Sequence, residues 1–178
     1  ITAGAIDVNI MAKVDKNNLS TSGEILPAEY SDALAALRGF ANSNLESSIV
    51  FSAGYNPRLY NYIENFKDFY PDENNHLQKK IILKVSDYRS ALIQGKLLAK
   101  KGLWVSEFRI ESGLNCGGHA FATDGILLGV IFEEFKNKRE ELLTELLALC
   151  NKANLEKGNS CFTVTPKLKI TAQGGIGT

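Results

Sequence analysis

The sequence predicts an α/β fold in which parallel strands alternate with helices, in a single domain spanning residues 1–178. Short apolar segments rich in β-branched residues recur along the chain, and segments with helical periodicity separate them. One of them, Lys80 to Val85, has the continuous apolar character of a strand buried in a parallel sheet. Polar or glycine-rich loops follow the strands, and active sites of such folds lie at the carboxyl ends of the strands.

The expected strands lie at 5–11, 48–52, 80–85, 103–110 and 168–172. The expected helices lie at 28–42, from Pro57 to about 66, from the caps Ser86 and Asp87 to Ala99, and at 125–155 in one piece or two. The long segments between them, at 16–26, 70–77 and 111–124, are expected to be loops. This order fits either a doubly wound open sheet or part of a barrel.

The overall composition is that of a globular domain, with 44% hydrophobic and 22% charged residues. Lys plus Arg and Asp plus Glu both number 20, so no electrostatic signal for nucleic acid or an anionic membrane is present. No apolar run is long enough to cross a bilayer. The charge balance leaves a homo-oligomer open. The chain does not begin with Met and stops within a glycine-rich turn, so we expect an internal segment of a longer protein.

Cysteine and histidine usage indicates a reduced cytoplasmic compartment and no metal site. The three cysteines, Cys116, Cys150 and Cys161, cannot all pair, and no Cys-x-x-Cys spacing occurs. The two histidines, His76 and His119, lie far apart in the sequence and do not form a ligand set with Cys116. The start of the chain also lacks the basic and apolar regions of a signal peptide.

Two glycine-rich turns carry the strongest functional signal. Gly174-Gly175-Ile176-Gly177-Thr178 follows the last strand, and its bare backbone N–H groups suit a phosphate. In (β/α)8 barrels the phosphate site lies after the late strands. The second turn, Cys116-Gly117-Gly118-His119, follows the preceding strand and ends in a histidine. An ordinary structural turn is the alternative interpretation of each.

Five segments occur in a set order: Ile6-Asp7-Val8-Asn9-Ile10-Met11, Ile49 to Pro57, Lys84-Val85-Ser86, Gly117-Gly118-His119 and Gly174-Gly175-Ile176. In this order the chain resembles the nitronate monooxygenase (2-nitropropane dioxygenase-like) family of FMN-binding barrels and the related flavin-dependent enoyl reductases. The resemblance implies a segment of a (β/α)8 barrel that lacks the family's first and last strands. The family's Gly-x-Pro turn is one residue longer here, and Leu114-Asn115-Cys116 precedes the Gly-Gly-His motif where the family has Glu-Ala.

The resemblance also implies an FMN-dependent oxidoreductase that acts on a nitronate or enoyl-type small molecule. Gly174, Gly175, Ile176, Gly177 and Thr178 would bind the FMN phosphate. Gly117 and Gly118 would let the backbone approach the flat cofactor or its phosphate. Asn9 and Lys84 would contact the flavin ring. His119 would act as a general base or orient the substrate.

Other interpretations of these residues stay open. Asn9 could cap a turn, Lys84 could be a surface or salt-bridged lysine, and His119 could make a structural hydrogen bond. Glu111 is expected either to pair with His119 or Arg109 or to be solvated. Two other functions remain as alternatives: a phosphate-binding barrel enzyme without flavin, and a non-catalytic binding or scaffold domain that retains the fold.

Overall fold

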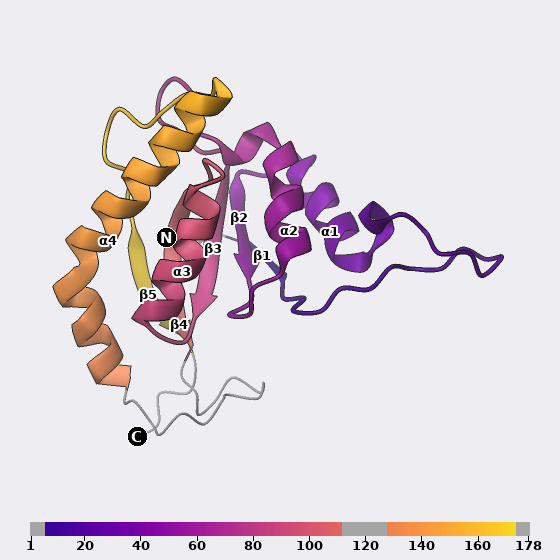
Figure 1. Ribbon diagram of the computed structural model, residues 1–178, viewed down its shortest axis with the longest axis horizontal. Helices are drawn as coiled ribbons and strands as arrows, with labels where there is room; N and C mark the ends of the chain where they lie inside the picture. Colours follow the sequence, from indigo (N-terminus) through magenta and orange to yellow (C-terminus); the bar gives the residue numbers. More distant parts are fainter. Residues whose placement is uncertain (1–5, 112–127, 174–178) are drawn as a thin grey trace, which may run out of the picture.

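A computed structural model of the chain describes residues 6–111 and 128–173 (Figure 1). Its centre is a sheet of five strands: β1 (Asp7–Ile10), β2 (Ser47–Phe51), β3 (Lys79–Val85), β4 (Val105–Glu111) and β5 (Lys169–Gln173). The strands are ordered β1-β2-β3-β4-β5, and every neighbouring pair is parallel. The predicted α/β fold with parallel strands is therefore confirmed.

Within the described sheet the strand order never reverses. A doubly wound sheet requires such a reversal, so that alternative is wrong for this part of the chain. Because βα-crossovers are right-handed, steps in a single direction place every connecting helix on the same face. Figure 1 shows this arrangement, with the helices in front of the sheet.

The helices are α1 (Asp32–Ala41), α2 (Pro57–Tyr62), α3 (Tyr88–Ala99) and α4 (Leu128–Lys157), with short 3-10 turns η1 (Ala28–Tyr30), η2 (Ile63–Asn65) and η3 (Lys67–Phe69). Of the two predicted caps of α3, Asp87 is confirmed: its carboxylate accepts from the Ser90 N–H, and the Ser90 hydroxyl in turn accepts from the Asp87 N–H. The segment predicted in one piece or two is one helix, α4.

The predicted helix at 28–42 is divided in two. Ser31 has an extended backbone between η1 and α1. Its hydroxyl donates to Asp15, 2.6 Å away, and this contact with a residue 16 positions earlier fixes the break. The second predicted helix is likewise shorter than expected, because α2 ends at Tyr62 and continues as η2.

The hydrophobic core fills the space between the sheet and the helices. Alternate strand residues point to that side and are nearly inaccessible, namely Ile49, Phe51, Ile81, Leu83, Val85, Phe108 and Ile110. Phe108 lies against Phe135 of α4, with ring centroids 6.4 Å apart, and also close to Gly95 of α3. The core thus fixes the helices on one face and leaves the opposite face of the sheet for polar residues.

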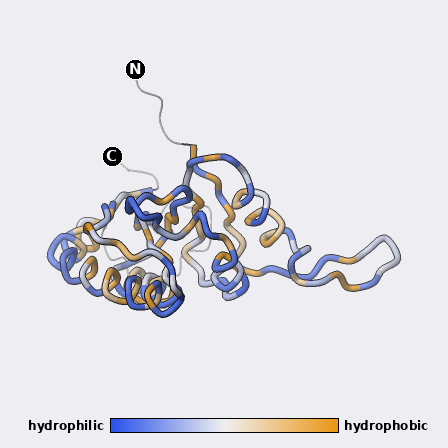
Figure 2. Tube along the Cα trace, turned by 90° about the horizontal axis from the view of Figure 1, so that it is seen from above, coloured by the Kyte–Doolittle hydropathy of each residue, from blue (hydrophilic) through white to orange (hydrophobic). Residues whose placement is uncertain are grey.

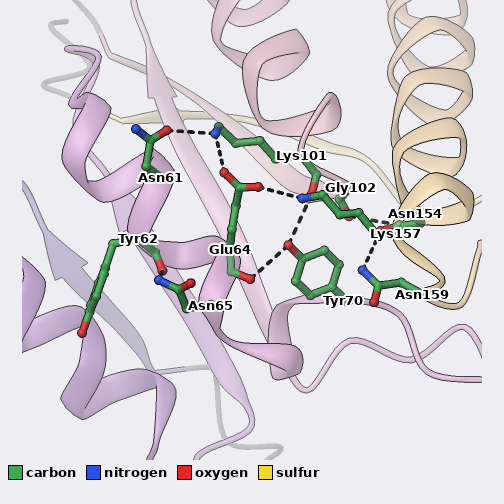
Figure 3. A network of polar contacts seen from close by, with 10 residues as sticks. All are labelled: Asn61, Tyr62, Glu64, Asn65, Tyr70, Lys101, Gly102, Asn154, Lys157 and Asn159. Atoms are coloured by element: carbon green, nitrogen blue, oxygen red, sulfur yellow. Dashed lines mark hydrogen bonds and ion pairs between the residues drawn. The ribbon is translucent and has the colours of Figure 1, made fainter.

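The ends of α3 and α4 are joined by a polar cluster at the amino-terminal edge of the sheet (Figure 3). Glu64 accepts from Lys157 at 2.7 Å and from Lys101. Burial raises the pKa of the Glu64 carboxyl, but hydrogen bonds from these two lysines outweigh burial and lower it. The buried Asn154 side chain donates to the Gly102 carbonyl at 3.1 Å. Both helix ends are therefore held together at the edge farthest from the candidate site.

The loop predicted at 16–26 forms an arm that projects from the body (Figure 2). Leu19 and Ile25 form a single antiparallel bridge, and both side chains are exposed. Asn18 anchors the base of the arm by donating to Asp32 at 2.8 Å. In the described parts of the chain, no helix is long and apolar enough to cross a membrane.

Candidate functional site

The sheet face that none of the described helices covers has three rows of polar side chains towards the carboxyl ends of its strands. Lys84, Arg109 and Thr171 are register partners on β3, β4 and β5. Glu107 and Lys169 form the row before them, and Glu111 and Gln173 the row after them. We call this surface the polar face. It gathers hydrogen-bond donors and acceptors at the edge where α/β folds place their sites.

Arg109 is the centre of one cluster on the polar face. Its Nε donates to Glu107 at 2.8 Å and its Nη2 to Asp7 at 3.2 Å. Thr171 donates to the same Glu107 oxygen at 2.7 Å. Burial lowers the pKa of the Arg109 guanidinium, but the hydrogen bonds to Glu107 and Asp7 outweigh it and raise the pKa. Three strands, β1, β4 and β5, are thereby connected through side chains.

The pairing of Asp7 with Arg109 shows that the sheet curves towards the polar face. β1 and β4 are three strand spacings apart, about 14 Å in a flat sheet, and the two side chains could not meet across that distance unless the sheet were curved. Val50 and Ile82 lie between them on the same face and are almost fully buried, although none of the helices in residues 6–111 and 128–173 covers that face. The polar face is therefore concave.

Lys84 forms a separate, buried ion pair with Glu111. The side chains are only 6% and 18% exposed, so both charges are largely removed from water. The expected pairing of Glu111 with Arg109 is wrong, because Arg109 is directed to Glu107 and Asp7 while Lys84 reaches Glu111 from the neighbouring strand. Lys84 is thus a salt-bridged lysine at a buried position, not on the surface.

Asn9 lies on the polar face of β1, two residues after Asp7, and is exposed. Its side chain makes no hydrogen bond with any of the residues that the structure describes, so turn capping is not seen there. Its amide can both donate and accept. Asn9 thus offers free hydrogen-bonding groups on the same face as Lys84.

The turn after β2, from Gly54 to Pro57, is held by the side chain of Asn56. The Asn56 carbonyl oxygen accepts from the Leu59 N–H at 3.2 Å and so caps α2. Its amide donates to the Ala12 carbonyl, 2.9 Å away, in the segment after β1. The loops that follow the first two strands are therefore tied to each other.

A second support of this turn comes from α3. Gln94 donates to the Ala53 carbonyl at 3.2 Å and accepts from the Tyr60 hydroxyl at 3.1 Å. Burial raises the pKa of the Tyr60 hydroxyl, and the neighbouring Tyr55 adds a smaller rise. The hydroxyl therefore stays protonated and donates to Gln94. Sequence reasoning missed Gln94 and Tyr60, and only Asn56 carried a usable signal, as a capping residue before Pro57.

The predicted residues Gly117, Gly118, His119, Gly174, Gly175, Ile176, Gly177 and Thr178 lie outside the described residues. The points from which the chain enters both segments are described. Glu111 and Gln173 are register partners on adjacent strands, about 5 Å apart. The chain therefore leaves the described sheet at two neighbouring points of the carboxyl edge, Gln173 directly before Gly174 and Glu111 six residues before Gly117.

A shallow open pocket of about 400 Å³ lies on the β5 side of the polar face. Its lining includes Glu107, Arg109, Thr171 and Gln173. Among residues 6–111 and 128–173, no group of three His, Cys, Asp or Glu side chains is placed to hold a metal ion. The described chemistry is that of hydrogen bonding and paired charge.

Comparison with known protein families, with curated proteins and with solved structures gives no match.

Proposed function

We propose that this chain forms part of a (β/α)8 barrel that binds FMN and is an oxidoreductase of the nitronate monooxygenase-like class, acting on a nitronate or an enoyl-type small molecule. One observation carries the proposal. On its way to the two glycine-rich turns the chain leaves the described sheet from the register partners Glu111 and Gln173, at the carboxyl edge of the polar face. Glycine-rich turns on late strands of barrels bind phosphate, and the resemblance of the ordered motifs to flavin barrels points to FMN as its carrier.

Three features of the sheet support the barrel. The strands follow one another in sequence order, right-handed crossovers put the helices on one face, and the opposite face is concave. In a (β/α)8 barrel a parallel sheet curves in this direction until it closes, with the helices outside and strand side chains filling the inside. Five strands do not close a barrel, so further strands in the complete protein belong to the proposal.

The residues present fit the cofactor. The edge of a flavin ring needs both donors and acceptors, and the Asn9 amide supplies both. The Lys84 ammonium has three N–H groups, and within the described residues its only ion-pair partner is Glu111, so donors remain for a ligand. FMN, when bound, supplies the transfer of electrons.

The chain's own residues bind, orient and hold charge. Gly174 to Thr178 would offer backbone N–H groups to the phosphate. Lys84 would place a positive charge beside the ring, where negative charge develops on reduction. His119 would accept the proton that the substrate loses, or orient the substrate.

The ligand class is tested on the complete protein after removal of any flavin. At about 100 times its dissociation constant, FMN should stabilise the protein by about 2.7 kcal/mol, seen as a rise in melting temperature. Riboflavin, which lacks the phosphate, should stabilise it much less. If a sugar phosphate stabilises the protein and FMN does not, the non-flavin phosphate enzyme replaces the proposal. If neither ligand stabilises the protein, the non-catalytic domain is favoured.

A further inference from the structure

The Lys84–Glu111 ion pair is largely removed from water at the edge of the sheet where the proposed site lies. It is buried at the carboxyl ends of β3 and β4, beside the start of the segment that contains His119. Removing two charges from water costs several kcal/mol per ion, and mutual attraction commonly fails to offset this cost. A buried pair is therefore weak evidence of a stabilising role.

The neighbouring charges leave Glu111 as the counter-charge of Lys84. Arg109 is the register partner of Lys84 on the next strand and carries the same charge. Arg109 is already paired with Glu107 and Asp7. Within the described residues, Glu111 is the one carboxylate in contact with the Lys84 ammonium. Removing the charge of Glu111 therefore leaves the positive charge of Lys84 without this counter-charge.

We propose that Glu111 is a positioning residue that holds the Lys84 ammonium at the carboxyl edge and, through its own charge, limits how strongly Lys84 favours negative charge on a bound flavin. The proposal rests on the proposed function. Lys84 and Glu111 would thus both act on the reduction potential of the flavin: Lys84 would raise it and Glu111 would lower it.

The signs follow from electrostatics in a poorly solvated site. Reduction adds two electrons and one proton to the ring and leaves it with one negative charge at neutral pH. A positive charge nearby stabilises that product and raises the potential, whereas a negative charge lowers it.

The test measures the two-electron reduction potential of FMN bound to the complete protein, in redox equilibrium with a dye of known potential. Glu111→Gln keeps an oxygen that accepts from Lys84 but removes the charge, and we expect at least a tenfold gain in reduced over oxidised flavin at fixed potential, about 30 mV upwards. Lys84→Met should shift the potential downwards by a similar amount. Glu140→Gln, on the exposed face of α4, is the matched control and should leave the potential unchanged.

Conservative variants keep the test decisive if one substitution prevents FMN binding. Glu111→Asp and Lys84→Arg retain the charges and should stay closer to the wild-type potential than Glu111→Gln and Lys84→Met. Shifts of the same sign in Glu111→Gln and Lys84→Met, or no shift, would show a structural pair and overturn this inference alone. If the wild-type protein takes up no FMN, the proposed function is overturned and this inference with it.

Discussion

Gly102→Ala should destabilise the protein by about 2–5 kcal/mol. Gly102 has φ +78°, where a residue with a Cβ costs roughly 1–2 kcal/mol. A Cβ there would also lie 2.1 Å from Oδ1 of the fully buried Asn154. Asn154 would have to move, and its lost hydrogen bond to the Gly102 carbonyl would leave buried polar groups unsatisfied, at about 1–3 kcal/mol. Urea denaturation measures the loss.

Gly158→Ala is the matched control. Both glycines end a helix in the same motif: the residue after each donates to a carbonyl five positions back, Leu103 to Leu98 and Asn159 to Asn154. Gly158 has φ +70°, and nothing lies within 4 Å of an added Cβ. We expect a cost of about 1–2 kcal/mol there, from backbone strain alone. Equal losses in the two variants would show that the Asn154 contact contributes little.

His119→Ala should lower kcat by about 10²- to 10⁴-fold, the usual contribution of a positioned general base. His119 belongs to the segment that the chain enters from Glu111, beside the proposed flavin site. The glycines that would bind the phosphate remain in the variant, so FMN content should be unchanged. The assay uses whichever of an alkyl nitronate and an enoyl thioester the wild-type protein converts, with FMN content measured in the same samples.

His76→Ala provides the control, because His76 is the other histidine of the sequence. It pairs with Glu46, 2.8 Å away, and both side chains are about half exposed. His76 precedes β3 and thus lies at the opposite edge of the sheet from the proposed site. We expect full activity in this variant. Full activity in His119→Ala would refute the catalytic role of His119 and favour the structural interpretation of its turn.

The elements of the fold could be predicted from the sequence because their signals are local. Strand periodicity, the Asp87 cap and Pro57 act within a few residues, and the expected strands lie within about two residues of those observed. The break at Ser31 could not be predicted, because it depends on Asp15, which lies outside the helical segment.

The partners of the site residues could not be predicted for a similar reason. Arg109 contacts Asp7 across 102 positions of sequence, and only the curvature of the sheet brings them together. Strand register then decides that Glu111 contacts Lys84 and not Arg109. A single sequence shows which residues follow a strand but not the register of that strand with its neighbour.

The measurement that tests the central claim most directly is an absorbance spectrum of the complete protein as purified, with the mass of any ligand released by heat. We expect flavin bands at about 370 and about 450 nm and a released ligand with the mass of FMN. A colourless protein that does not take up added FMN would contradict the account, and the glycine-rich turns would then have a different ligand or a structural role.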